Sequence, residues 1–533
     1  MWKYICYVVG VLVGTSLIVC GIFGSITMPK LIDEKIRKTL VIVEGSEGYK
    51  KFVSSPVPMQ AQVYLFNVTN AEELLDYDVK PKLEQVGPFF LTESRRKEIV
   101  KFNDKNTTLD YRLYRTYYFE ADKSAPLSSV ITIPNVAAFT AISSAVEKNK
   151  MDENTLATNV LSEKLVNETM YLTDTAENIL FKGIRLTWLD ALEKDMAMDN
   201  GPPNNTFGIF YGKNGTWDKE ADGTMTISTG YDGNMTNIGR VLLWNGKTEL
   251  STWKGDPCNR IVGTDGTSFH PNIRKEEKLE VFSPDLCRSL AIEFKQITSM
   301  KSVELYRYGM APSFYDPIDS SDETKCYCVK KTPREKKQFC SARGIIDLSS
   351  CRRKPIVMST PHFFNGDDNL RNVFEGLQPS HQEHDTYIDV EPITGYVLRA
   401  KRRLQVNVEM LQNEDFTMAN TPILQRMGRL IHPFLYIDQS GTITDELLAK
   451  LEAKLITKIR LYKILLYSAI VTGAILLTAT LIFIMYEVTT TGKKEKKQRA
   501  VKGTVGDVAA GEVLLNNLDK DKQQQNASSG LIR

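Results

Sequence analysis

The chain has 533 residues, of which 42% are hydrophobic and 25% are charged, and its formal net charge is +2. This near-neutral balance excludes a strongly basic nucleic-acid-binding protein, so we expect no nucleic acid among its partners. The length could hold two or three average domains. However, no linker-like stretch and no internal repeat divides the central region, which we expect to fold as one large domain.

Two charge-free apolar spans lie near the ends of the chain. The first covers residues 4–28 and the second covers residues 464–486, and each exceeds the roughly 20 residues that cross a bilayer core. The first span is longer than a signal-peptide core and has no clear A-x-A site after it. We therefore expect an uncleaved signal anchor and a multi-pass (two-pass) protein. Cys6, at the edge of the first span, is a candidate for palmitoylation.

The region between the spans has two features of an extracellular or lumenal domain. Six cysteines cluster within residues 258–351, and their even number favours an oxidised framework, although the sequence alone allows 15 pairings. Six N-x-S/T sequons are candidate glycosylation sites, at Asn67, Asn106, Asn167, Asn204, Asn214 and Asn234. We therefore place residues 29–463 outside the cytosol and residues 1–3 and 487–533 inside it.

The central region reads as β-rich with a helical insertion. Half-buried strands are predicted at residues 63–68, 116–121, 224–229 and 395–411, the last long enough for two strands or one bent strand. Apolar residues at helical spacing predict a helical block at about 134–198, and a further helix starts at Asp445 and leads into the second span. From about Thr489 the tail is polar and poor in aromatics, which predicts disorder.

Enzyme chemistry finds little support in the sequence. The cluster HQEHD at 381–385 is not an HExxH zinc motif, and its polar surroundings favour a solvated turn over a metal site. No GxSxG, P-loop or GxGxxG occurs in a suitable context. We therefore predict no catalytic residue, no metal and no cofactor.

A series of segments, in one order along nearly the whole chain, resembles the class B scavenger receptor family. The segments are EGSEGYKKFVSSPVPMQAQVYLFNVTNAEEL at 44–74, KLEQVGPFF at 82–90, GTDGTSFHP at 263–271, FSPDLCRSL at 282–290, KCYC at 325–328, GIIDLSSC at 344–351, STPHF at 359–363 and HDTYIDVEPITGYVLRAKRRLQVNV at 384–408. The resemblance implies an α+β membrane protein with an antiparallel β-barrel-like ectodomain, a helical apex bundle at about 134–198 and an apolar tunnel.

The resemblance also implies site residues and ligands. The fatty-acid-translocase branch of the family implies the disulfides Cys258–Cys326, Cys287–Cys351 and Cys328–Cys340. It implies that apex lysines meet anionic ligands, here Lys148, Lys150 and Lys164, although neighbouring acidic residues dilute their field and the sequon at Asn167 departs from the pattern. The implied partners are fatty acids, phospholipids, sterols and other lipids, and lipoproteins. The implied function is lipid uptake or transfer through the tunnel.

Two other functions remain open within the same family. One is a lysosomal membrane receptor that sorts a lumenal enzyme or exports lipid, and the other is a phagocytic receptor for apoptotic cells or microbes. The tail contains Leu514–Leu515 and Leu531–Ile532, but Ala510 and Ala527 stand where adaptor-binding dileucine signals have an acidic residue. We therefore favour the plasma membrane over the lysosomal or endosomal membrane.

Overall fold

A computed structural model of the chain describes residues 2–54, 57–75, 79–149, 163–165, 168–190, 205–217, 222–330, 336–352, 354–410 and 430–526. The chain divides into two compact units. Lys35–Glu452 forms one unit, and Met1–Glu34 with Ala453–Arg533 forms the other. The region between the two apolar spans therefore folds essentially as a single body, which we call the ectodomain.

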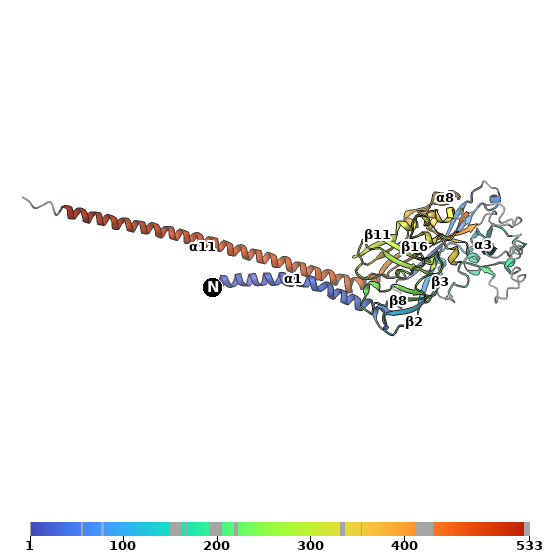
Figure 1. Ribbon diagram of the computed structural model, residues 1–533, viewed down its shortest axis with the longest axis horizontal. Helices are drawn as coiled ribbons and strands as arrows, with labels where there is room; N and C mark the ends of the chain where they lie inside the picture. The colour runs from blue at the N-terminus through green and yellow to red at the C-terminus, as the bar shows by residue number, and fades with distance from the viewer. Residues whose placement is uncertain are drawn as a thin grey trace, which may run out of the picture. The chain divides into compact units, whose positions relative to one another are not determined.

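The ectodomain is built on one antiparallel sheet of thirteen described strands, most of which appear in Figure 1 as the arrows around β16 and β3. In spatial order the main path is β10 (Leu279–Ser283), β11 (Arg288–Met300), β12 (Val303–Met310), β15 (Tyr387–Val390), β16 (Val397–Met410), β17 (Leu430–Thr442), β1 (Met59–Val68), β2 (Leu83–Phe102), β3 (Thr108–Phe119), β8 (Thr224–Ser228) and β9 (Val241–Trp244), and β13 (Ile345–Asp347) and β14 (Ile356–Ser359) branch from β16. All four strand regions predicted from the sequence lie in this sheet. The longest of them is one strand, β16, with a register shift against β17 between Val406 and Asn407.

A short segment between β9 and β10 connects the two ends of this path. Val241 at the start of β9 donates its N–H to the Gly263 carbonyl over 2.8 Å. Thr264 then donates to the Glu280 carbonyl over 3.0 Å and accepts from the Phe282 N–H over 2.9 Å, both on β10. Gly263 has φ +99°, and a Cβ there would collide with the Glu280 backbone, so the close approach requires glycine. The sheet is thus nearly closed into a barrel, which leaves little free edge.

The largest apolar core lies where β1 and β2 meet α3 (Val136–Asn149). Asn135 begins α3, because its side-chain oxygen accepts the Ala138 N–H over 3.1 Å. Phe139 and Ile142 of α3 are buried in the same cluster as Val63 of β1 and Phe89 of β2. Figure 1 shows α3 beside one end of the strands, and its contacts with β16 agree with that view.

The predicted helical block is only partly helical. Within residues 134–198, β5 (Tyr171–Thr175) pairs with β4 (Val130–Pro134), and β6 (Ile184–Arg185) pairs with β7 (Thr206–Phe207). The Tyr-Leu-Thr-Asp-Thr run of β5 is rich in residues that favour strands, and the neighbouring β4 supplies the partner it needs. Residues 150–162, 166–167 and 191–198 of the predicted block lie outside the described residues.

The remaining helices include the two long ones that contain the apolar spans. α1 covers Trp2–Leu40 and α11 covers Thr457–Asn526, and both are long and apolar enough to cross a membrane. Their packing is close, because a Cβ on Gly473 would lie 2.8 Å from the Gly14 carbonyl oxygen. The shorter helices are α2 (Glu47–Val53), α7 (Ser349–Arg352), α8 (Asp368–Arg371), α9 (His381–His384) and α10 (Asp445–Leu451).

The tail differs from its prediction. α11 continues past the second span to Asn526, where the sequence predicted disorder from about Thr489. The span is already helical, so the tail extends an existing helix and avoids the cost of nucleation. Lys, Glu, Gln, Arg and Ala dominate residues 493–502, and these are good helix formers.

Candidate functional site

One face of β2 changes character along its length. Alternate residues of a strand share a face, and on this strand the face begins with Phe89 and Leu91, both buried in the apolar core. It continues with Glu93, Arg95 and Lys97, whose side chains are 0%, 24% and 9% exposed. A single strand face therefore carries an apolar half followed by a charged half.

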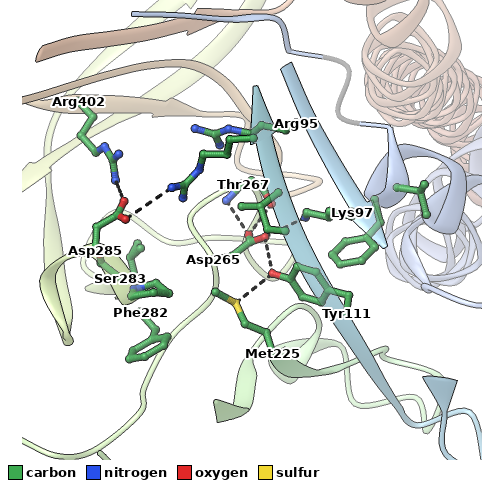
Figure 2. A pocket seen from close by; sticks show the side chains of 16 residues that line it. Arg95, Lys97, Tyr111, Met225, Asp265, Thr267, Phe282, Ser283, Asp285 and Arg402 are labelled. Atoms are coloured by element: carbon green, nitrogen blue, oxygen red, sulfur yellow. Dashed lines mark hydrogen bonds and ion pairs between the residues drawn. The ribbon is translucent and has the colours of Figure 1, made fainter. Parts of the chain in front are cut away.

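The charged half borders a cavity with a volume of about 110 Å³. Figure 2 shows Asp285 and Arg402 on one side of the cavity, and Asp265, Lys97 and Tyr111 on the other. Its lining comes from α2, β2, β3, β8, β10 and β16, together with the loop around Asp265, and combines charged and apolar side chains: Phe52, Val53, Arg95, Lys97, Tyr111, Leu113, Arg115, Met225, Asp265, Thr267, Val281, Phe282, Ser283, Pro284, Asp285 and Arg402.

Two arginines stand directly opposite each other in this lining. Arg95 of β2 and Arg115 of β3 are cross-strand partners in the antiparallel register. Glu93 lies between them, with its Oε1 at 2.7 Å from Arg95 Nε and 3.6 Å from Arg115 Nε. Glu93 also accepts a hydrogen bond from Gln439 Nε2 over 2.7 Å, which fixes its carboxylate. The buried carboxylate thus holds together two like charges that would otherwise repel.

Asp285 gathers three further guanidinium contacts. Its carboxylate lies 3.2 Å from Arg402, 3.6 Å from Arg115 and 3.8 Å from Arg352. Burial alone would raise the pKa of Asp285, but the arginines, Arg115 first, more than offset burial and lower that pKa far below its usual range. Burial also disfavours the charged form of Arg115, yet Asp285 and Asp222 together raise its pKa. These groups are therefore ionised at every physiological pH.

The other side of the cavity is organised around Asp265. Its carboxylate accepts hydrogen bonds from Lys97 Nζ over 2.9 Å and from the Tyr111 hydroxyl over 3.1 Å. Burial opposes ionisation, but Lys97 and the hydrogen bonds from Thr267 lower the pKa of Asp265 to about 2. Lys97 Nζ also lies 3.8 Å from the centre of the Phe52 ring. The lining therefore offers fixed charges beside aromatic surface, which suits the binding of an amphipathic molecule.

The apex lysines are not brought together in the described part of the chain. Lys148 lies in α3 by its backbone, but its side chain is outside the described residues, as is all of Lys150. Lys164 is described, and its Nζ lies 3.3 Å from Glu163 Oε1. That ion pair reduces the positive field that Lys164 presents to an anionic ligand.

The six ectodomain cysteines form three disulfides in the structure. They are Cys258–Cys326, Cys287–Cys351 and Cys328–Cys340, with Cα–Cα distances of 5.9, 6.4 and 5.5 Å. These are the pairs that the family resemblance implies. Each bond closes a loop in the region that carries Asp285 and β10 to β14, so the disulfides support one wall of the cavity. Cys6 and Cys20 are free and exposed, and palmitoylation of Cys6 stays a prediction.

The sequons fall in different environments. Asn106 lies in the turn between β2 and β3, and Asn214 and Asn234 are exposed in loops. Asn67 lies within β1, and its Oδ1 accepts the Thr132 N–H over 2.8 Å, so this side chain already has a structural role. Asn167 and Asn204 lie outside the described residues. Glycosylation of the six sites stays a prediction.

The prediction of a solvated turn at 381–385 is wrong for one of its residues. His381 is exposed, but His384 is 2% exposed and its ring stacks on His362 with centroids 4.5 Å apart. Ser380 caps α9 and donates its N–H to His384 Nδ1 over 2.9 Å. An imidazole ring can pack as a flat apolar body, and burial lowers the pKa of both histidines, to about 4 for His362. Among the residues that the structure describes, no group of His, Cys, Asp and Glu is placed to hold a metal ion.

The charged cavity could not be recognised in the sequence. Every residue from Thr92 to Glu98 is polar, so alternation between polar and apolar residues could not reveal which side chains point inward. The available signal was the length of the strand itself. A run of seven polar residues that continues a buried strand must place every second side chain on the same face as Phe89 and Leu91.

Comparisons with known proteins place the chain in a family. A model of the CD36 family matches residues 12–484. Lysosome membrane protein 2 of Rattus norvegicus is 31% identical over 431 residues, which cover 80% of this chain and 83% of that protein. Sensory neuron membrane protein 1 of Apis mellifera is 28% identical over 464 residues, which cover 83% and 84%. The resemblance to class B scavenger receptors is therefore confirmed, and the chain belongs to the CD36 family.

Proposed function

We propose that this chain is a two-pass membrane receptor that binds lipids or anionic, lipoprotein-type ligands and facilitates lipid uptake or transfer to the bilayer. One observation carries the proposal. The ectodomain of a CD36-family chain, bounded in sequence by two apolar helices, contains a cavity that combines apolar side chains with fixed charges. An amphipathic ligand needs both kinds of surface.

The physical basis of transfer is the poor solubility of lipid monomers. A lipid chain in water exposes apolar surface at a cost of about 0.8 kcal/mol per CH₂ group. A domain attached to the bilayer at both ends keeps a bound lipid near the membrane, and an apolar tunnel would shield its chain on the way. No covalent step is required, and net movement follows the concentration gradient.

The same proposal includes the predicted topology and apex. Residues 4–28 and 464–486 would cross the membrane, residues 29–463 would lie outside the cytosol, and both termini would lie inside it. Lys148, Lys150 and Lys164 would meet anionic ligands at the apex. The six sequons would carry glycans, which glycosidase treatment followed by a mass measurement would detect.

Lipid uptake by cells tests the proposal directly. Cells that express the chain at the plasma membrane should accumulate a fluorescent long-chain fatty acid faster than cells with an empty vector. A cell line with equal surface expression of an unrelated two-pass glycoprotein is the control for membrane perturbation. Equal uptake in all three lines, for fatty acid and for phospholipid, would contradict a role in lipid transfer.

A lysosomal membrane location is the second candidate, favoured by the identity to the rat Lysosome membrane protein 2. Immunofluorescence of the full chain against plasma-membrane and lysosomal markers distinguishes the two locations. Replacement of Leu514 and Leu515 by alanine should shift a lysosomal protein toward the cell surface if that pair is a sorting signal. A chain that resides at the surface before the replacement would exclude the lysosomal candidate.

A further inference from the structure

The charged lining of the ectodomain cavity is costly for the fold. Arg95 and Arg115 face each other across β2 and β3, and like charges in directly opposite positions destabilise a sheet. Both side chains are largely withdrawn from water, with exposed fractions of 24% and 17%. Glu93, also buried, is required to hold them. Burial of charged groups does not by itself stabilise a fold. A buried cluster of charges is therefore typical of a binding site.

The cluster has more hydrogen-bond donors than acceptors. Within the described residues Arg115 Nε makes no hydrogen bond, and Arg95 has one partner there, Glu93, through Arg95 Nε. The terminal nitrogens of Arg95 have no acceptor among the described residues. Each guanidinium carries five N–H groups in a planar fork that matches the oxygens of a carboxylate or a phosphate. The donors around the cavity therefore suit a guest rich in oxygen acceptors.

The balance of charge points to the same kind of guest. The side chains that line the cavity include four cations, Arg95, Lys97, Arg115 and Arg402, and two carboxylates, Asp265 and Asp285. An anionic guest would reduce this excess of positive charge.

The size of the cavity restricts what part of a guest can enter. The cavity has a volume of about 110 Å³. Pockets that enclose drug-sized ligands measure roughly 300–1,000 Å³. The cavity can thus hold a carboxylate or a phosphate group, but not a lipid chain. Phe52, Leu113 and Val281 supply apolar surface beside it, where the first methylene groups of a chain could pack.

We propose that this cavity binds the anionic head group of a lipid, a carboxylate or a phosphate, between Arg95 and Arg115. The inference rests on the proposed function and names the chemical class of ligand that the ectodomain takes. The guanidinium groups donate hydrogen bonds to the head-group oxygens, while Glu93 and Asp285 keep the arginines in place. Neutral lipids of the same chain length lack the charge and bind more weakly at this position.

Native mass spectrometry of the purified full chain tests the head-group preference without any mutation. The probes are hexadecanoic acid, hexadecyl phosphate and methyl hexadecanoate, which share one chain length. We expect the acid, the phosphate or both to bind at least about tenfold more tightly than the ester, as charge-assisted hydrogen bonds predict. The stronger of the two anions identifies the head group. Equal binding of all three would overturn the head-group site, and no binding of any probe would contradict the proposed function as well.

A matched pair of variants then locates the site. Arg95→Met should weaken binding of the preferred anion about tenfold and leave binding of the ester unchanged. Arg96→Met is the control, because Arg96 is the next residue on β2, faces outward and packs over Tyr114 and Trp217. Equal loss in both variants, or no loss in a folded Arg95→Met protein, would overturn the assignment. If Arg95→Met does not fold, the comparison of the three probes on the wild-type chain still decides the head-group preference.

Discussion

The two halves of the β2 face differ in the side chains that they bury, apolar in one half and charged in the other. Phe89 and Leu91 pack against β1 and α3 in the apolar core, where any unpaired polar group is costly. Two residues further along the charged side chains begin: Glu93 pairs with Arg95 and with Arg115 of β3, and Lys97 pairs with Asp265 in the loop before β10. The apolar half stabilises the fold. Burial of the charged half is costly, and the stability from the apolar half offsets the cost of keeping a binding site in place.

The two regions also differ in the protonation of their buried titratable groups. His432 of β17 packs between Tyr171 and Phe374 in the apolar core, and its Nε2 has no hydrogen-bond partner in the part of the chain that the structure describes. Burial lowers its pKa to about 4, so this histidine is neutral. Asp265 in the cavity keeps only 16% of its side chain exposed, yet Lys97 helps to hold it ionised down to a pKa of about 2. A charge is tolerated in the cavity and excluded from the core.

The largest effect should follow truncation in the apolar half. Phe89→Ala removes a side chain with no exposed surface and should reduce the free energy of unfolding by about 3–5 kcal/mol. Thermal unfolding of the purified chain measures this loss. Phe90→Ala is the control on the opposite face, where the side chain is only half-buried, and should cost clearly less. Equal costs would mean that the two faces of β2 are not distinguished as described.

A smaller loss should follow neutralisation of the carboxylate in the charged half. Glu93→Gln leaves Arg95 and Arg115 opposed without a counter-charge, and its amide NH2 faces the donor of either Arg95 or Gln439. We expect a loss of about 2–3 kcal/mol. Glu98→Gln on the exposed face of the same strand should have almost no effect. A stable Glu93→Gln protein would contradict the role given to this carboxylate.

Acid should weaken the apolar core before it weakens the cavity. The pKa of His432 and of His362 is about 4 in the folded chain, below the usual value of 6.5, so the unfolded chain binds more protons between these limits. Stability is complete above pH 6.5 and falls toward pH 4 by up to about 1.4 kcal/mol per pH unit for each histidine. Asp265 contributes to stability over a different pH range. Because its pKa is lowered to about 2, its contribution is complete above about pH 4 and is lost only as the pH falls toward 2.

Urea denaturation at several pH values checks this order. His432→Phe should flatten the decline between pH 6.5 and 4, whereas His381→Gln, at an exposed position, should leave the decline unchanged. An unchanged slope in a folded His432→Phe protein would show that His432 is not the group that resists protonation in the core.

The smallest effect on stability should come from the apex. The Lys164 side chain is 20% exposed, but its partner Glu163 is open to solvent, and ion pairs of this kind contribute little, so Lys164→Gln should change the free energy of unfolding by less than about 1 kcal/mol. It should nevertheless reduce binding of anionic lipid vesicles at low ionic strength if the apex docks them. Unchanged vesicle binding by a folded variant would remove Lys164 from the docking surface, while head-group binding in the cavity should be the same in either case.

The fold could be predicted where a single physical cause, such as burial of a strand face or the thickness of a bilayer, determines the sequence pattern. Strands such as β1 and β8 alternate or run apolar because one or both faces are buried, and the spans at 4–28 and 464–486 are recognisable by length alone. Prediction failed where a distant partner decided the structure. Tyr171–Thr175 became a strand because β4 lies beside it, and His384 became buried because His362 offers a stacking surface.

The candidate site could not be predicted from the sequence, because it also depends on partners that are distant in the chain. Its charges come from strands and loops as distant as Lys97, Asp265 and Arg402, and their pairing depends on the near-closure of the sheet. The opposition of Arg95 and Arg115 depends on strand register, which local sequence does not specify in a fully polar segment. Only the family resemblance pointed toward lipid ligands, and it did so without naming these residues.

The most direct test of the account is mass spectrometry of the lipid that co-purifies with the full chain in detergent, compared with a mock purification from cells without it. We predict a specific enrichment of lipids with a carboxylate or phosphate head group in the wild-type sample, and a reduced enrichment in Arg95→Met at equal protein. A lipid profile identical to the mock purification would contradict the claim that this ectodomain is a lipid-binding domain.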